Sequence, residues 1–378
     1  MSSTPISTVM KEYDGITKRG ENRDKVQYRR GDLVHGFECV SVLPVPELNV
    51  TAYQFIHKKT RADYLHIDAS DTDNVFSITF RTPCQNNTGV SHILEHTTLC
   101  GSEKYPVHDP FMKMRKRSLQ TYMNAWTFDD HTTYPVSSTI PRDLANLMDV
   151  YCDATFFPLL RLADFKQEGW RLENNEIKGV VYNEMKGYQG DPTRSIFSAV
   201  SSAYLANTNY QYVSGGVPSA IPSLRYEDLI AFHTTHYHPS NCLFFSYGDI
   251  HPEHHMHFLD SQVLSRFTAN ESSRDIHVTT LTEKALRSPE KEFTFTCPQS
   301  GSEPSQRWHY LRVYPTNLTT DSKDVIRLQF LSMLLFRGQS SPFYKSLIES
   351  QKARLFNPLQ GYITFSKNSF FSIGASEI

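Results

Sequence analysis

The sequence predicts an α+β fold in which helices pack on a largely antiparallel sheet. Short runs that alternate apolar and polar residues come first along the chain, and longer helical patterns follow them. The strand-like runs cover residues 36–45, 50–58, 63–69, 74–82 and 241–250. The helical patterns cover residues 90–100, 110–123, 141–157, 180–206 and 223–238. A group of strands followed by a group of helices is typical of an α+β sandwich.

The length of 378 residues indicates about two domains, because a single hydrophobic core rarely grows to this size. We expect a polar leader at 1–27, a main domain at 28–267, a polar linker at 268–292 and a second domain at 293–378. Strand-like runs at 293–297 and 308–315 and a helical pattern at 324–338 open the second domain. It is short for a copy of the first, so we expect an incomplete domain of similar type.

The composition gives limited information about partners and compartment. The chain has 38 basic and 40 acidic residues and a net charge of −2, so no general attraction to nucleic acid is expected. Six cysteines without a Cys-x-x-Cys pair fit a reducing compartment. The sequence contains no run of about eighteen apolar residues, so no membrane-spanning helix is expected. The first 27 residues include Glu12, Asp14, Glu21 and Asp24, which a mitochondrial transit peptide would lack.

The stretch "SHILEHTTLCGSEKYP", which begins at Ser91, has the composition of a metal site. Gly89 and Gly101 mark the ends of a predicted helix. His92 and His96 are four residues apart, so both imidazoles project from one helical face, and Glu95 lies on the same side. This is the inverted zincin order His-x-x-Glu-His. It predicts a zinc ion held by two imidazoles, with Glu95 as the general base of a peptidase.

The residues alone leave alternatives open. Two histidines and a glutamate within five residues also occur by chance in ordinary amphipathic helices. A third ligand would strengthen the metal hypothesis, and "GVVYNEMKG" places Glu184 inside an otherwise apolar helical run, although a solvated helix face would explain it equally well. Spacing does not exclude Glu168, Glu173 or Glu176 as rivals for that position.

Several blocks of the sequence resemble one family of metallopeptidases. They are "GVSHILEHTTLCGSEKYPVHDPF", "MNAWTFDDHTTYPVSS", "QEGWRLE", "KGVVYNEMKG", "HYHPSN" and "SPFYKSLIES". In this order they look like the presequence protease and falcilysin branch of the pitrilysin-type, or inverzincin, metallopeptidases. The resemblance runs from Tyr28 to the last residue. It implies a pitrilysin-type fold.

The resemblance also implies roles for individual residues. His92, His96 and Glu184 would bind one zinc ion per chain, and Glu95 would be the general base. Asn124 and Ala125 would lie on an edge strand that pairs with the bound peptide, although an internal strand is the simpler interpretation of that segment. Leu99 and Phe111 would line the substrate pocket, positions that any hydrophobic core would also use.

The function implied by the resemblance is that of a zinc metalloendopeptidase acting on unstructured peptides, such as cleaved mitochondrial targeting peptides. Similar proteases are considerably longer, and their C-terminal half contributes an arginine and a tyrosine to the site. We therefore expect the chain alone to be a poor peptidase, with a C-terminal half as its missing partner. The alternatives are a catalytically incompetent or partner-dependent peptide-binding half and a β-like subunit of the mitochondrial processing peptidase. The resemblance implies the mitochondrial matrix, and the cytoplasm is the alternative compartment.

Overall fold

The computed structural model describes residues 26–282, 292–296, 308–376 and 378. They form two compact units. The first contains the described residues up to Pro83, Thr88–Tyr182 and Ser214–His277, and the second contains Cys84–Asn87, Asn183–Val213 and the described residues from Val278 to Ile378. The predicted leader lies almost wholly outside the described residues, as does the part of the predicted linker at 283–291, so the predicted domain boundaries stay a prediction.

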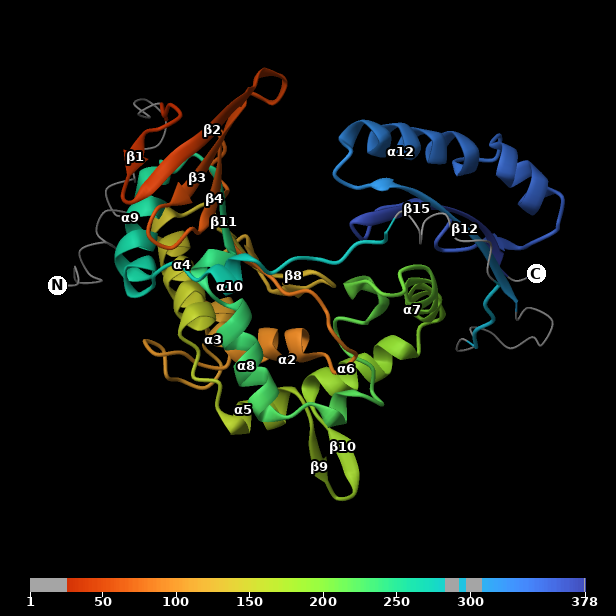
Figure 1. Cartoon of the computed structure of the whole chain (residues 1–378), viewed down its shortest axis with the longest axis horizontal. Helices are drawn as coiled ribbons and strands as arrows, with labels where there is room; N and C mark the ends of the chain where they lie inside the picture. Colours follow the sequence, from red (N-terminus) through yellow and green to blue (C-terminus); the bar gives the residue numbers. More distant parts are fainter. Residues whose placement is uncertain (1–25, 283–291, 297–307, 377) are drawn as a thin grey trace. The chain divides into compact units, whose positions relative to one another are not determined.

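A nine-stranded sheet forms the centre of the first unit (Figure 1). Its strand order is β1-β2-β3-β4-β11-β5-β8-β6, and β7 also pairs with β8. The strands are β1 (Leu33–Val34), β2 (Phe37–Val45), β3 (Val50–His57), β4 (Asp63–Asp68), β5 (Asn74–Arg81), β6 (Tyr122–Met123), β7 (Trp126–Thr127), β8 (His131–Ser138) and β11 (Cys242–Gly248). Every pair is antiparallel except β11 with β4, which agrees with the predicted α+β class.

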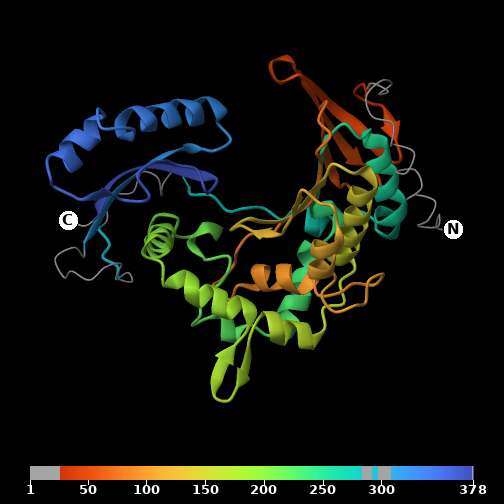
Figure 2. The ribbon, with the colours of Figure 1, turned by 180° about the vertical axis from the view of Figure 1, so that it is seen from behind.

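Helices of the first unit cover one face of this sheet. They are α2 (Val90–Thr98), α3 (Pro110–Arg117), α4 (Pro141–Phe156), α5 (Leu162–Glu168), α8 (Tyr226–His236), α9 (Pro252–Gln262) and α10 (Glu271–Arg274). Helix α4 packs on β5 and β8, and Figure 2 shows α4 and α9 side by side. Alternate residues of the strands point into this layer, so Phe76, Ile78 and Phe80 of β5 are fully buried. This alternation is the pattern that identified the strands in the sequence.

The helix predicted at 110–123 is shorter than expected. It ends at Arg117, and the next residues extend into β6, which pairs with β8. Ser118 adopts an extended backbone, and its hydroxyl donates to the carboxylate of Asp143 at 2.8 and 2.9 Å. Pairing with the sheet therefore overrides the helical pattern after Arg117.

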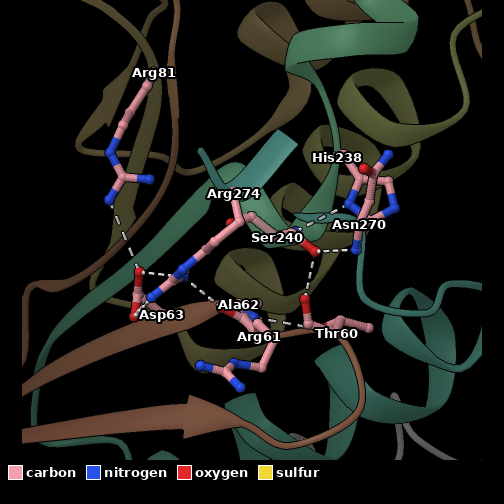
Figure 3. A network of polar contacts seen from close by, with 9 residues as sticks. All are labelled: Thr60, Arg61, Ala62, Asp63, Arg81, His238, Ser240, Asn270 and Arg274. Atoms are coloured by element: carbon pink, nitrogen blue, oxygen red, sulfur yellow. Dashed lines mark hydrogen bonds and ion pairs between the residues drawn. The ribbon is translucent and has the colours of Figure 1, made fainter. Parts of the chain in front are cut away.

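The first unit ends in a polar network around Arg274 (Figure 3). The guanidinium of Arg274 donates to the Asp63 carboxylate at 2.9 Å and to the Arg61 carbonyl at 2.7 Å. The Ser240 hydroxyl donates to the backbone carbonyl of Thr60 at 2.6 Å and accepts from the backbone N–H of Asn270 at 2.9 Å. These bonds attach the short helix α10 to the start of β4.

The second unit has its own antiparallel sheet of four strands, in the order β12-β15-β13, with β14 also paired to β15. Its elements are α7 (Pro192–Tyr204), β12 (His309–Leu318), α12 (Ser322–Phe336), β13 (Leu355–Phe356), β14 (Gly361–Ile363) and β15 (Asn368–Ser376). The predicted strand at 308–315 and helix at 324–338 correspond to β12 and α12. The strand predicted at 293–297 is wrong for residues 293–296, which are not part of a strand, and residue 297 lies outside the described residues. Helix α12 packs against β14, and Phe336 at its end is buried against the ring of Phe371.

Candidate metal centre

Helix α2 is held at its N-terminus by a close backbone contact. Gly89 precedes the helix with a φ of 71°, in the left-handed region that favours glycine. A Cβ atom at this position would lie 2.4 Å from the carbonyl oxygen of Gly215. The Ser91 hydroxyl also donates to the Ser214 carbonyl at 3.3 Å. The loop 214–216 therefore fixes where the helix begins and which way its side chains point.

The two histidines of α2 lie side by side, as their spacing predicted. The ring centroids of His92 and His96 are 4.9 Å apart, and the rings are nearly perpendicular. Burial and the neighbouring His96 lower the pKa of His92 to about 3. His92 is therefore a neutral imidazole at physiological pH, which is the form that binds a metal ion.

Glu184 joins these histidines from a different helix. It lies on α6 (Val180–Gln189), and one ligand atom from each of His92, His96 and Glu184 falls within 4.8 Å of the others. Two imidazoles and a carboxylate are the donor set of many catalytic zinc sites.

The three rival glutamates have other positions and partners. Glu168 ends α5, and its Oε2 lies 3.1 Å from Nδ1 of His96. Glu173 pairs with Arg171 at 2.9 Å and with Lys178 at 3.1 Å. Glu176 is exposed at the start of β10 (Glu176–Lys178). None of the three belongs to the group of converging ligand atoms among the described residues.

Glu168 has the geometry of a carboxylate that orients a metal ligand. Burial raises its pKa, but the hydrogen bonds from His96 and Gln167 outweigh burial, and the pKa falls below its usual value. The carboxylate is therefore ionised and accepts the Nδ1 proton of His96. A ligand histidine commonly donates its second ring N–H to such a group, so this arrangement would leave Nε2 of His96 for a metal ion.

A contact between two glycines brings Glu168 and the start of α6 together. Gly169 follows Glu168, and a Cβ atom there would lie 3.0 Å from Cγ2 of Ile93 on α2. A Cβ atom on Gly179, just before α6, would lie 2.0 Å from the carbonyl oxygen of Gly169. Only glycine permits both approaches. The hairpin of β9 (Arg171–Glu173) and β10 is the loop between these two glycines.

Glu95 is held on the side of α2 that faces the edge of the sheet. Its side chain is buried, with 7% of the residue exposed, and Oε2 accepts a hydrogen bond of 2.5 Å from the Thr127 hydroxyl. The Thr98 hydroxyl donates to the Glu95 carbonyl at 2.8 Å and lies 3.2 Å from the Tyr134 hydroxyl. Sequence reasoning did not single out Thr127, although it lies within the quoted block "MNAWTFDDHTTYPVSS".

The segment with Asn124 and Ala125 lies at the edge of the sheet, between β6 and β7, which both pair only with β8 among the described strands. The backbone N–H of Asn124 donates to the Pro135 carbonyl at 3.2 Å, and the backbone carbonyl of Asn124 accepts from the Tyr151 hydroxyl at 3.2 Å.

The two residues predicted to line the substrate pocket lie on neighbouring helices. Leu99 caps the C-terminus of α2, and the ring of Phe111 on α3 lies 6.4 Å from the ring of Tyr151. Both Leu99 and Phe111 are half-buried.

Comparisons with known proteins identify the family of this chain. Residues 81–213 match the model described as "Insulinase (Peptidase family M16)", and residues 223–376 match "Peptidase M16 inactive domain". The chain belongs to the M16 peptidase family. Within that family it is 44% identical to "Presequence protease, mitochondrial" of Mus musculus over 364 residues, which cover 93% of this chain and 35% of the relative. The protein of the same name from Schizosaccharomyces pombe is 42% identical and is also covered to 35%.

Two solved structures share the fold of this chain. A protease from Helicobacter pylori matches with a TM-score of 0.62 and 16% identity, over 86% of this chain and 75% of that structure. Pitrilysin matches with a TM-score of 0.64 and 15% identity, over 91% of this chain and 36% of pitrilysin. The predicted pitrilysin-type α+β fold is confirmed, and so is the resemblance to presequence proteases. The chain spans about a third of the length of the curated relatives it matches.

Proposed function

We propose that this chain carries the zinc site of a metalloendopeptidase of the presequence-protease type. The observation that carries the proposal is the convergence of His92, His96 and Glu184 within 4.8 Å beside the buried carboxylate of Glu95. These residues are the ligands and the base that a zinc peptidase requires. Membership of the M16 family supports a metal, and the donor set favours one zinc ion per chain.

Each residue has a distinct task in this proposal. His92, His96 and Glu184 would hold the ion, and Glu168 would keep the imidazole of His96 in the correct tautomer and orientation. When bound, zinc supplies Lewis acidity that activates water and polarises a carbonyl group. Glu95 would accept the proton of the attacking water on its carboxylate and pass it to the leaving amine.

The edge of the sheet supports an unstructured peptide as substrate. β6, Asn124, Ala125 and β7 form the outermost segment of the sheet, and an extended peptide can add to such an edge through main-chain hydrogen bonds. Recognition through the main chain tolerates many sequences. Leu99 and Phe111 would contact substrate side chains near the ion.

The names of the relatives extend the proposal to a compartment and a partner. Because the matched relatives are mitochondrial presequence proteases, we infer cleaved targeting peptides as substrates and the mitochondrial matrix as location. The chain matches 35% of those relatives, so a C-terminal half of such a protease is the partner we propose for full activity. In the described residues, no helix is long and apolar enough to cross a membrane.

Glu95→Gln tests the proposed reaction. The purified chain is loaded with zinc and assayed on a fluorogenic unstructured peptide, alone and with the C-terminal half of a related presequence protease. Glu95→Gln should keep about one equivalent of zinc. Its turnover should fall by about 10²–10⁴, the usual contribution of general acid–base catalysis.

Glu176→Gln is the matched control, because Glu176 is exposed on the β9–β10 hairpin outside the ligand group, and it should retain wild-type turnover. Unchanged turnover in Glu95→Gln would contradict the assignment. Peptide binding without turnover, even with the C-terminal half present, would favour a peptide-binding function.

A further inference from the structure

Thr127 connects the edge strand to the proposed catalytic base. It lies on β7 and pairs with Thr132 of β8, so the sheet fixes its backbone. Its hydroxyl donates to Oε2 of Glu95 at 2.5 Å. The flanking residues Trp126 and Phe128 are 47% and 46% exposed. Because side chains alternate along a strand, Thr127 is the residue of this trio that faces α2.

The contact decides how Glu95 is held. A glutamate side chain has three rotatable bonds, so the helix alone does not define where its carboxylate lies. An O–H···O⁻ bond of 2.5 Å has the length typical of a charge-assisted hydrogen bond, which is about twice as strong as a neutral one. Thr127 therefore restricts the rotamer of Glu95. Because Oε2 accepts this hydrogen bond, the contact also determines that Oε1 is the carboxylate oxygen turned away from the strand.

The position of Thr127 in the chain gives this contact a further consequence. Asn124 and Ala125, which we propose to pair with the substrate main chain, are three and two residues before Thr127 in the same edge segment. A peptide that docks on this segment is therefore placed by the same piece of backbone that places the base. The register of the peptide on the edge then sets the distance from its scissile bond to Glu95.

We propose that Thr127 is a positioning residue that aligns the Glu95 carboxylate with a peptide docked on the β6–β7 edge. The inference rests on the proposed function, because it requires Glu95 to act as the base. Thr127 itself does not touch the reacting atoms. Its hydroxyl is needed as a donor, so serine preserves the effect and valine, which has nearly the same shape, removes it.

The test compares Thr127→Val, Thr127→Ser and Thr133→Val in the zinc-loaded chain, under the conditions in which the wild type cleaves peptide. Thr133 is the matched control: it is half-buried on β8, and its hydroxyl lies 2.8 Å from that of Thr79. In Thr127→Val we expect kcat to fall by about 10–100-fold, since a misplaced catalytic group can cost about 10². KM should stay within about twofold of the wild type, as it does when an interaction serves only the transition state. Thr127→Ser should recover most of kcat, and Thr133→Val should match the wild type.

Further measurements separate positioning from a structural role. Zinc content and the thermal midpoint should be the same in Thr127→Val and Thr133→Val. In a Glu95→Gln background, Thr127→Val should have no additional effect, because residues that act as a unit are not additive. If Thr127→Val does not fold, Thr127→Ala replaces it in every comparison.

The outcomes also distinguish this inference from the proposed function. A wild-type kcat in Thr127→Val, or a loss of kcat that Thr127→Ser does not recover, overturns the positioning role. If Glu95→Gln is inactive in the same experiment, the proposed function still stands. An active Glu95→Gln variant overturns both.

Discussion

Helices α2 and α9 both carry clustered histidines, and only α2 assembles a ligand group. The segment His251–His257 holds four histidines in seven residues, twice the number in α2. In α9 the side chains diverge: His255 is buried near Phe76, and His257 stacks on His35 with ring centroids 4.7 Å apart. In α2, the spacing of four residues keeps His92 and His96 on one face, and a carboxylate arrives from α6. The number of histidines therefore indicates a metal site less well than a shared face and an acid from a second element.

Electrostatics alone does not separate the two helices. Burial lowers the pKa of His92 to about 3, and burial together with His254 and His251 lowers the pKa of His255 to about 3 as well. Both imidazoles are neutral at physiological pH, so each could in principle bind a metal ion. The difference lies in the neighbours. His92 has His96 and Glu184 within ligand distance, whereas no such group forms around His255 among the described residues.

The largest expected effect comes from removing one histidine from each helix. His96→Ala should lose about one equivalent of zinc and all peptidase activity, because two ligands rarely retain a catalytic zinc. His257→Ala removes a histidine that stacks on His35 and should keep both zinc and activity. Metal analysis of the purified variants, with activity measured in parallel, checks the contrast. Equal zinc content in the two variants would show that α2 is not the metal helix.

A smaller effect is expected from the carboxylate that holds His96. In the wild type, Oε2 of Glu168 lies 3.1 Å from Nδ1 of His96. Glu168→Gln keeps the shape of the side chain but weakens this hydrogen bond. Loss of such a supporting group typically lowers metal affinity by about 10–100-fold. Competition with a chelator of known zinc affinity measures the change.

Glu173→Gln is the control, because Glu173 pairs with Arg171 and Lys178 on the hairpin. Its zinc affinity should equal that of the wild type. The same affinity in Glu168→Gln would mean that Glu168 does not support the site.

The local part of the site was predictable from the sequence, because it depends on helical spacing. The positions of His92, Glu95 and His96 on one turn follow from the sequence alone. The choice among Glu168, Glu173, Glu176 and Glu184 did not, and only the family resemblance favoured Glu184. That choice depends on the close contact between Gly169 and Gly179, which brings two distant helix ends to α2. A contact between backbones leaves no periodic pattern in a sequence.

The fold shows the same division: features that depend on local spacing were predictable, and features that depend on contacts between distant segments were not. Strands β2 to β5 were predicted nearly to the residue, because alternate side chains such as Phe76 and Ile78 are buried on one face. The helix predicted at 110–123 was wrong beyond Arg117, where pairing of β6 with β8 decides the conformation. Thr127 was missed for a similar reason: its role depends on Glu95 of α2, which is 32 residues away in the sequence.

The smallest expected effect concerns the stability of the α9 region as the pH falls. The pKa of His255 is about 3 in the folded protein, below the value of about 6.5 expected in the unfolded chain. Below about pH 6.5 the unfolded chain therefore binds the extra proton, and the free energy of unfolding falls by up to about 1.4 kcal/mol per pH unit. Above about pH 6.5 the histidine is neutral in both states, so it does not lower the free energy of unfolding. His255→Leu should reduce this pH dependence by the share that His255 contributes, whereas His257→Gln should leave it unchanged. Urea unfolding of metal-free protein at pH 7 and pH 5.5 measures the difference, and chelation leaves the His92 contribution equal in all variants. The same loss of stability on acidification in wild type and His255→Leu would show that His255 takes up its proton without unfolding.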